Sequence, residues 1–344
     1  MYEDFYRLTG KPFQLSPDPA FYFGSKGHNS AFSYLKYGVY QGEGFLVITG
    51  DIGTGKTTLV RALLNELHSG EVVAAQIVST QLDADDLLRA VAAAFGISTR
   101  VDGKAHLIST IEAFLLTTFQ SGKRALLIVD EAQNLGARSL EELRMLSNFQ
   151  CGDHALMQSF LIGQPELRML MRSPLMEQFR QRVIASYHLG PLDQPDTRAY
   201  VEHRLAHVGW TADPAFEADA FAEIHRATGG VPRRINTLVN RVLLAGYLGE
   251  KHVITRADIA AASAEIANET GATLEKAPPP APGAKSGTGT GRIGARPLAA
   301  ITDRIEQLEH NVDGLLNVVR GIVEPERALP DEETRGPARS SKGR

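Results

Sequence analysis

Residues 45–64 read FLVITGDIGTGKTTLVRALL and contain the spacing G-x-x-x-x-G-K-T between an apolar run and a helical pattern. In this context, glycines allow successive backbone N–H groups to curl around phosphate oxygens, and a helix start adds positive potential. The pattern predicts a nucleotide site in which the lysine reaches the β- and γ-phosphates and the next threonine ligates Mg²⁺. The predicted loop comprises Gly50, Asp51, Ile52, Gly53, Thr54, Gly55, Lys56, Thr57 and Thr58.

A second motif, RALLIVDEAQNL, places Asp130 and Glu131 at the end of another apolar run. Ligands bind at the carboxyl ends of strands in open α/β sheets. Two adjacent charges at such a position each need a partner, unless they are simply a solvated pair. We predict that Asp130 holds Mg²⁺ through a water molecule and that Glu131 polarises the attacking water. A chain that only stored nucleotide would have no need of Glu131.

The elements that must position these residues form an alternating pattern. Short apolar runs without polar alternation are separated by segments with helical apolar spacing, which is typical of a parallel sheet covered on both faces. We therefore predict an α/β fold with a three-layer, P-loop type parallel-sheet core over residues 45–190. The predicted strands are residues 45–49, 72–78, 125–130, 159–163 and 183–189.

Residues 191–268 show only helical patterns and predict a small all-helical domain. Asp196 or Thr197 is expected to cap its first helix, while Gly229–Gly230 and Gly249 end later ones. Residues 1–44 form an arm before the first strand, and its beginning is rich in proline and aromatic residues without a period.

The C-terminal quarter predicts three further segments. Residues 269–297 are rich in Pro, Gly, Ala, Ser and Thr, which predicts a flexible linker. Residues 298–323 carry an apolar seam with alternating spacings of three and four, typical of a coiled coil; a lone helix docking on its own domain is the alternative. Residues 324–344 are polar and predict a disordered tail. The seam consists of Leu298, Ile301, Ile305, Leu308, Val312, Leu315, Val319 and Ile322.

Composition gives no sign of a nucleic-acid or membrane protein. The 344 residues are 43% hydrophobic and carry a formal net charge of −4, so no global attraction to polyanions exists. The single cysteine, Cys151, cannot form an internal disulfide, and its surroundings carry no activating motif. Without a signal peptide or a long apolar run, we expect a cytoplasmic protein that reaches the inner membrane only through partners.

The motifs DEAQNL, LIGQPEL and GGVPRRIN together resemble the AAA+ ATPases of the general secretion pathway protein A type, over about residues 1–266. The amino-acid sequence of the arm is similar to that of the secretion ATPases found with exosortase (PEP-CTERM) and exopolysaccharide systems of Gram-negative bacteria. The resemblance implies ATP and Mg²⁺ as cofactors and residues 191–268 as a helical lid. It also implies an arm that borders the nucleotide site, with Pro12 and Phe13 beside the base; an arm that packs on the core is the alternative, and the two are compatible. Full-length relatives carry a transmembrane segment and a peptidoglycan-binding region; neither is recognisable here, so we expect no attachment to the cell wall.

The resemblance also assigns site residues. Gln164 matches the sensor-1 polar residue near the γ-phosphate, with a turn-capping amide as the alternative. Arg233 matches the sensor-2 arginine that reaches from the lid to the phosphates, and Arg234 is the neighbour it could be confused with. Thr80 is implied as a polar switch that contacts Glu131.

Arg180 and Arg182, in LMEQFRQRVIASYHL, stand where AAA+ proteins present an arginine finger to the nucleotide of the next subunit. We prefer Arg182, with a surface salt bridge as the alternative. An arginine that acts across a subunit boundary implies a homo-oligomer, which the predicted coiled coil would hold together or connect to a partner.

Three functions fit these residues. The first is an ATPase that assembles or remodels a secretion or exopolysaccharide-export apparatus with inner-membrane partners. The second is a DNA-handling AAA+ protein of the initiator or transposition-helper kind, although such proteins usually add a basic winged helix or arm that is not recognisable here. The third is a nucleotide-gated scaffold with negligible turnover.

Overall fold

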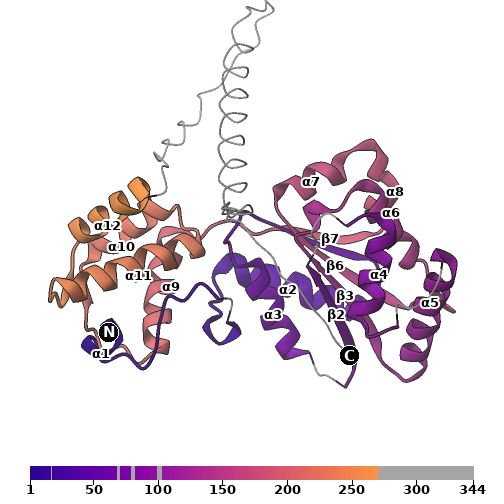
Figure 1. The fold of residues 1–344 in the computed structure, drawn as a ribbon, viewed down its shortest axis with the longest axis horizontal. Coiled ribbons are helices and arrows are strands. Elements are labelled where there is room, and N and C mark those ends of the chain that lie inside the picture. The colour runs from indigo at the N-terminus through magenta and orange to yellow at the C-terminus, as the bar shows by residue number, and fades with distance from the viewer. Residues whose placement is uncertain (17, 68–69, 79–81, 99–102, 270–344) are drawn as a thin grey trace, which may run out of the picture. The chain divides into compact units, whose positions relative to one another are not determined.

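The computed structural model describes residues 1–16, 18–67, 70–78, 82–98 and 103–269, which belong to one compact unit, Met1–Glu275 (Figure 1). Thr80, the predicted linker beyond Glu269, the heptad seam and the C-terminal tail lie outside the described residues. The predictions for them stay predictions.

Five parallel strands form the central sheet, in the order β2-β3-β6-β1-β7. All five predicted strands are present, with ends that differ by at most two residues. Because every pair is parallel, the carboxyl ends of all strands lie at one edge of the sheet. The strands are β1 (Phe45–Thr49), β2 (Val72–Val78), β3 (Arg124–Asp130), β6 (Met157–Gly163) and β7 (Val183–His188).

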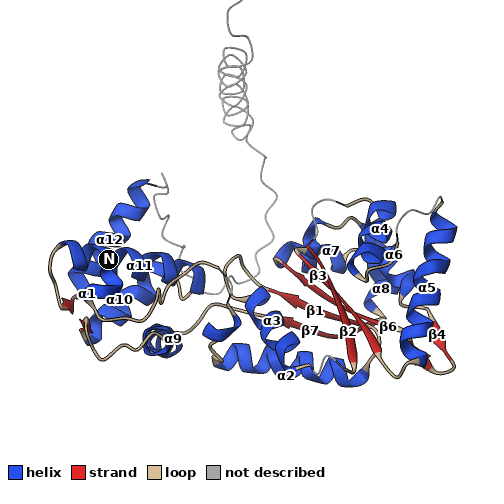
Figure 2. Cartoon of the chain, turned by 60° about the horizontal axis from the view of Figure 1, so that its bottom comes forward, coloured by secondary structure: helices blue, strands red, loops and turns tan. Residues whose placement is uncertain are grey.

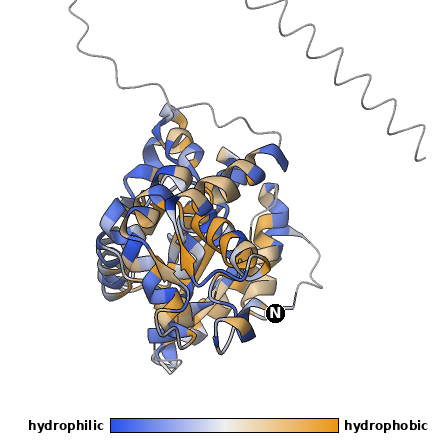
Figure 3. Ribbon diagram, turned by 90° about the vertical axis from the view of Figure 1, so that its left-hand side faces the viewer, coloured by the Kyte–Doolittle hydropathy of each residue, from blue (hydrophilic) through white to orange (hydrophobic). Residues whose placement is uncertain are grey.

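Helices cover both faces of this sheet, which confirms the predicted three-layer α/β architecture (Figure 2). Successive side chains of a strand point to opposite faces, so Phe45 and Val47 join one apolar cluster while Leu46 and Ile48 join the other. The apolar strands stand out in the interior of Figure 3. One face carries α2 (Lys26–Gln41) and α3 (Lys56–Glu66); the other carries α4 (Ala84–Ala94), α5 (Lys104–Gln120), α6 (Ala137–Leu146), α7 (Pro165–Arg172) and α8 (Glu177–Arg180).

The predicted helical domain is present and packs around its own apolar cluster. Its first helix begins earlier than predicted, because the Asp193 carboxylate caps it by accepting the backbone N–H of Asp196 at 2.7 Å. The assignment of Asp196 or Thr197 as the cap is therefore wrong, whereas Gly229 and Gly249 end helices as predicted. The elements are α9 (Gln194–His207), α10 (Ala218–Thr228), α11 (Pro232–Leu248), α12 (Arg256–Glu269) and the short strands β8 (Ala215–Phe216) and β9 (Val253–Ile254).

The N-terminal arm contacts both parts of the unit. Its first residues form α1 (Tyr2–Phe5) and a 3-10 turn, η1 (Pro19–Phe21), and supply Tyr6 and Phe13 to the core of the helical domain. The last part of the arm is the helix α2, which packs Ala31 and Leu35 against the sheet. This helix was not predicted from the sequence. Tertiary packing therefore outweighs the modest helix propensity of its glycines and tyrosines.

A few short elements complete the described chain. Strands β4 (Gln150–Cys151) and β5 (His154–Ala155) form an unpredicted antiparallel hairpin, in which Cys151 is a free, half-buried thiol beside the core. Short 3-10 turns, η2 (Ala132–Asn134) and η3 (Pro174–Met176), precede α6 and α8. Within the described ranges, no helix combines the length and hydrophobicity needed to cross a bilayer.

The glycine pair before α11 gives a test of how the two parts of the unit are joined. Both residues have positive φ, but a Cβ on Gly230 would lie 2.0 Å from the Leu192 carbonyl oxygen, whereas one on Gly229 meets nothing within 4 Å. We expect Gly229→Ala to lower the free energy of unfolding by about 1 kcal/mol through its left-handed backbone. Gly230→Ala should lower it by roughly 2 kcal/mol or more, because the clash adds to that strain. Urea denaturation followed by circular dichroism measures both; equal losses would contradict the close approach.

Candidate nucleotide site

A cavity of about 370 Å³ opens at the carboxyl edge of the sheet. Its walls come from the predicted loop after β1, from Glu131 after β3, from the N-terminal arm, and from α9 and α11. Segments that are far apart in the chain therefore meet here. The predicted loop residues that line it are Ile52, Gly53, Gly55, Lys56, Thr57 and Thr58, while Gly50, Asp51 and Thr54 do not.

Lys56 is held inside the loop. Its ammonium group donates to the backbone carbonyl oxygens of Gly50 at 2.8 Å and Asp51 at 2.9 Å, and the side chain is buried. Burial lowers the pKa of Lys56, while the nearby carboxylates of Glu131 and Asp130 oppose this shift. The two carbonyl oxygens thus hold the Lys56 side chain in place on the cavity wall.

Thr57 and Asp130 meet as predicted for a magnesium site. The Thr57 hydroxyl donates to Asp130 Oδ2 at 2.9 Å, and Asp130 Oδ1 accepts the backbone N–H of Glu131 at 2.9 Å. Mg²⁺ prefers oxygen ligands and usually takes only one or two from protein, the others coming from phosphate and water. This buried carboxylate and hydroxyl therefore fit the predicted ion.

Glu131 is oriented by two amides. Its carboxylate accepts from Gln133 Nε2 at 2.6 Å and from Gln164 Nε2 at 3.2 Å, and Gln133 Oε1 accepts the backbone N–H of Gln164 at 2.9 Å. Glu131 also has φ of 53°, a left-handed conformation that costs a non-glycine residue about 1 kcal/mol or more. Strain of this kind persists only where the surroundings define the geometry closely.

Two of these findings bear on the sequence predictions. Gln164 is the N-cap residue of α7, but its side chain makes no capping hydrogen bond, which removes the capping alternative. Gln133 was not predicted. Its place two residues after the carboxylate, in DEAQ, is the signal that could have pointed to it.

The helical domain reaches the cavity through α11. The backbone N–H of Arg233 donates to the Gly53 carbonyl oxygen at 3.1 Å, and its side chain lines the cavity. Arg234 does not line it. The geometry therefore agrees with the choice of Arg233 over its neighbour.

The arm borders the cavity, but not through the predicted residues. Phe13 is buried in the core of the helical domain, and the Pro12 carbonyl oxygen accepts from Arg204 Nε at 2.5 Å. The assignment of both beside the base is wrong, because apolar packing draws Phe13 away from the cavity. Later residues of the arm line it instead: Gln14, Leu15, Ser16, Asp18, Phe21, Tyr22 and Phe23.

A buried histidine from the arm was missed altogether. His28 lines the cavity beside the loop, and its ring nitrogens lie 2.7 Å from Ser25 Oγ and 3.0 Å from the Thr54 carbonyl oxygen. No motif spacing connects a histidine to a loop 26 residues later, so only the fold reveals the contact.

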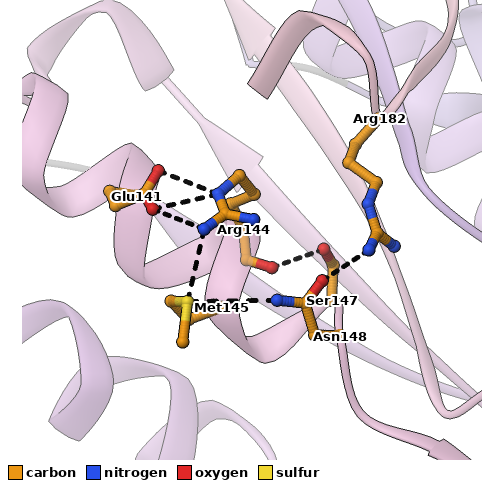
Figure 4. Close-up of polar contacts among 6 residues, drawn as sticks. All are labelled: Glu141, Arg144, Met145, Ser147, Asn148 and Arg182. Atoms are coloured by element: carbon orange, nitrogen blue, oxygen red, sulfur yellow. Dashed lines mark hydrogen bonds and ion pairs between the residues drawn. The ribbon is translucent and has the colours of Figure 1, made fainter. Parts of the chain in front are cut away.

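The two candidate finger arginines lie at the opposite edge of the sheet. Arg182 precedes β7, and its backbone carbonyl oxygen accepts the N–H of Phe45 at the amino end of β1. Its guanidinium donates to Asn148 Oδ1 at 2.6 Å, beside the end of α6 (Figure 4). Arg180 donates to the carbonyl oxygens of Met171 and Ser173, both at 2.7 Å, and so braces its own loop.

Comparison with known proteins agrees with this geometry. Residues 39–171 match the family model described as an AAA domain, a range that includes the loop, both acidic residues and Gln164. Residues 39–171 are therefore assigned as an AAA domain. The chain is also 40% identical over 267 residues to general secretion pathway protein A of Aeromonas hydrophila, which covers 77% of this chain and 48% of that protein. The chain thus spans about half the length of this relative.

Solved structures share the fold of this AAA domain and its helical neighbour. The ORC2 protein of Aeropyrum pernix in ADPNP–ADP complexes aligns with a TM-score of 0.55 and 16% identity, over 70% of this chain and 68% of that one. Cdc6p of Pyrobaculum aerophilum aligns with a TM-score of 0.54 and 16% identity, over 73% and 71%. At this identity the likeness concerns fold alone.

Substitutions at the two charged positions should separate nucleotide binding from hydrolysis. We expect Glu131→Gln to reduce ATP turnover at least 100-fold while ATP affinity stays within about threefold, because the carboxylate activates water rather than holding phosphate. Lys56→Ala should instead weaken ATP binding about tenfold or more. Phosphate release and titration with a fluorescent ATP analogue measure the two effects. Unchanged turnover in Glu131→Gln would contradict the assignment and favour a scaffold without hydrolysis.

Proposed function

We propose that this chain couples ATP hydrolysis to the assembly or remodelling of a bacterial secretion or exopolysaccharide-export apparatus, of the kind associated with exosortase. The observation that carries the proposal is the 40% identity to general secretion pathway protein A, because it extends over 267 residues and not over the nucleotide motifs alone. The partners would be inner-membrane components of that apparatus, and the chain would act in the cytoplasm or at the inner face of that membrane.

The contacts in the cavity suggest how its residues divide the work. Lys56 and the backbone of the loop would hold the phosphates, with Arg233 closing over them from α11. Thr57 and Asp130 would ligate Mg²⁺, which supplies charge neutralisation when bound. Glu131 would accept a proton from the attacking water, held in place by the amides of Gln133 and Gln164.

The position of Arg182 supports a role in another subunit. The loop follows the carboxyl end of β1, while Arg182 is bonded to its amino end. Five residues of strand rise about 16 Å, which exceeds the reach of an arginine side chain. Arg182 would therefore serve the nucleotide of a neighbouring copy. Arg180 is the weaker candidate, because its guanidinium already satisfies two carbonyl groups of its own chain.

No observation favours the DNA-handling alternative. The formal net charge is −4, and the Cdc6p and ORC2 proteins share the fold at only 16% identity. We propose that nucleic acid is not a partner.

Mixing two inactive variants tests the shared site. Arg182→Ala lacks the donated arginine and Lys56→Ala lacks the receiving site, so each alone should have little turnover. Mixed oligomers contain some interfaces that join an intact Arg182 to an intact Lys56, and these should recover up to about a quarter of wild-type turnover in an equimolar mixture. Arg180→Ala serves as control and should lower the melting temperature more than Arg182→Ala does. No recovery at any ratio would argue against a role in trans.

Export in the bacterium that encodes the chain tests the cellular function. Replacing the chromosomal copy with Glu131→Gln should reduce the exported polysaccharide or protein at least tenfold, as deletion does, because bound but uncleaved ATP stops the cycle. The wild-type copy supplied from a plasmid is the control. Normal export would contradict the proposal. Tight, salt-sensitive retention of duplex DNA by the purified chain would support the DNA-handling alternative instead.

A further inference from the structure

His28 is built into the first turn of α2, and that turn faces the phosphate-binding loop. The Ser25 hydroxyl caps the helix by accepting the backbone N–H of His28 at 3.2 Å, and it lies 2.7 Å from His28 Nδ1. The side chain is only 5% exposed and lines the cavity. Both the helix start and the ring are therefore defined by the same hydroxyl group.

The hydrogen-bond partners of the ring identify its tautomer. A carbonyl oxygen can only accept, so the 3.0 Å contact with Thr54 requires a proton on His28 Nε2. Burial lowers the pKa of His28, which favours the neutral ring. In that form Nδ1 accepts from the Ser25 hydroxyl, so both ring nitrogens are satisfied.

This contact determines the direction of the next backbone donor in the loop. The peptide between Thr54 and Gly55 is trans, so its N–H points opposite to its C=O. With the carbonyl group of Thr54 held against His28, the N–H of Gly55 is turned away from the ring. Gly55 has φ of 95°, and a Cβ there would lie 2.9 Å from His28 Nε2. The ring and the glycine thus fit each other closely.

We propose that His28 is a positioning residue that orients the Thr54–Gly55 peptide so that the loop presents its backbone N–H groups to the phosphates of the nucleotide. The inference rests on the proposed nucleotide site and adds a residue from the arm to it. The His28 Nε2–H group acts through the loop and not on the reacting atoms. His28 should therefore affect the affinity for the phosphates and have little effect on the chemical step. A histidine that merely fills the core would change stability instead.

A pair of variants separates these roles. His28→Gln keeps an N–H donor at nearly the reach of Nε2, whereas His28→Leu keeps apolar volume and leaves the Thr54 carbonyl group without its donor. Titration with a fluorescent ADP analogue should show about tenfold weaker binding for His28→Leu, and His28→Gln should stay within about threefold of wild type. In steady-state ATP hydrolysis, the kcat of His28→Leu should change less than about threefold, while its KM for ATP rises about tenfold. His106→Leu, an exposed histidine on α5, is the control for the loss of an imidazole.

The outcomes are distinct. Wild-type affinity in His28→Leu, or equal losses in His28→Gln and His28→Leu, would overturn the proposal. If His28→Leu fails to fold, the KM of His28→Gln for ATP decides the question. A wild-type KM in His28→Gln supports the proposal, and a KM raised tenfold overturns it. Lys56→Ala tests the nucleotide site itself. If Lys56→Ala still binds ADP, the proposed nucleotide site is contradicted. If Lys56→Ala loses ADP binding while His28→Leu keeps wild-type affinity, only the proposed role of His28 is contradicted.

Discussion

The parallel alignment of three neighbouring strands is the constraint on which the site depends. Strands β3, β6 and β1 lie side by side and point the same way, so each delivers its following residue to the same edge of the sheet. Glu131, Gln164 and the phosphate-binding loop are those following residues, and Asp130 is the last residue of β3. Hydrogen bonds then tie them together, from the backbone N–H of Gly50 to the Gly163 carbonyl oxygen and from Gln164 to Glu131. A change in the register of any one strand would separate groups that need contact within 3 Å or so.

The cavity is closed by segments that the sheet does not supply. The arm is held to α9 by the buried Arg204, whose guanidinium binds the Pro12 carbonyl oxygen and the Tyr200 hydroxyl and stacks over Phe21. Farther along, His28 connects the same arm to the loop. The arm is thus bonded to the helical domain at one point and to the phosphate-binding loop at another. Any movement of the helical domain about the nucleotide would have to carry part of the arm with it.

The two ends of β1 have different chemistry. Its carboxyl end opens into the loop, and its amino end bonds to the backbone of Arg182, whose side chain rests on Asn148. Asn148 follows α6, and the segment that leads into α6 starts at Glu131. The segment from Glu131 through α6 to Asn148 therefore connects the carboxylate of the candidate site to the residue that binds Arg182.

Much of the site was predictable because the relevant physics is local. Unalternated apolar runs identify buried parallel strands, and a glycine-rich turn between such a strand and a helix identifies a phosphate loop; both signals depend only on nearby residues. Asp130 and Glu131 were found for the same reason. The family resemblance added Arg233, which the fold places on the cavity wall, and Gln164, whose amide donates to Glu131.

The tertiary structure alone decided which distant groups meet. Phe13 is adjacent in sequence to the lining residue Gln14 but is buried in the core of the helical domain, because its apolar ring is removed from water there. His28 carries no spacing signal, and its role follows from a hydrogen bond to the Thr54 carbonyl group, 26 residues away, that only folding brings near. Local patterns in the chain determined its strands and its phosphate loop, whereas the partners of each polar side chain depended on packing between segments that the sequence does not relate.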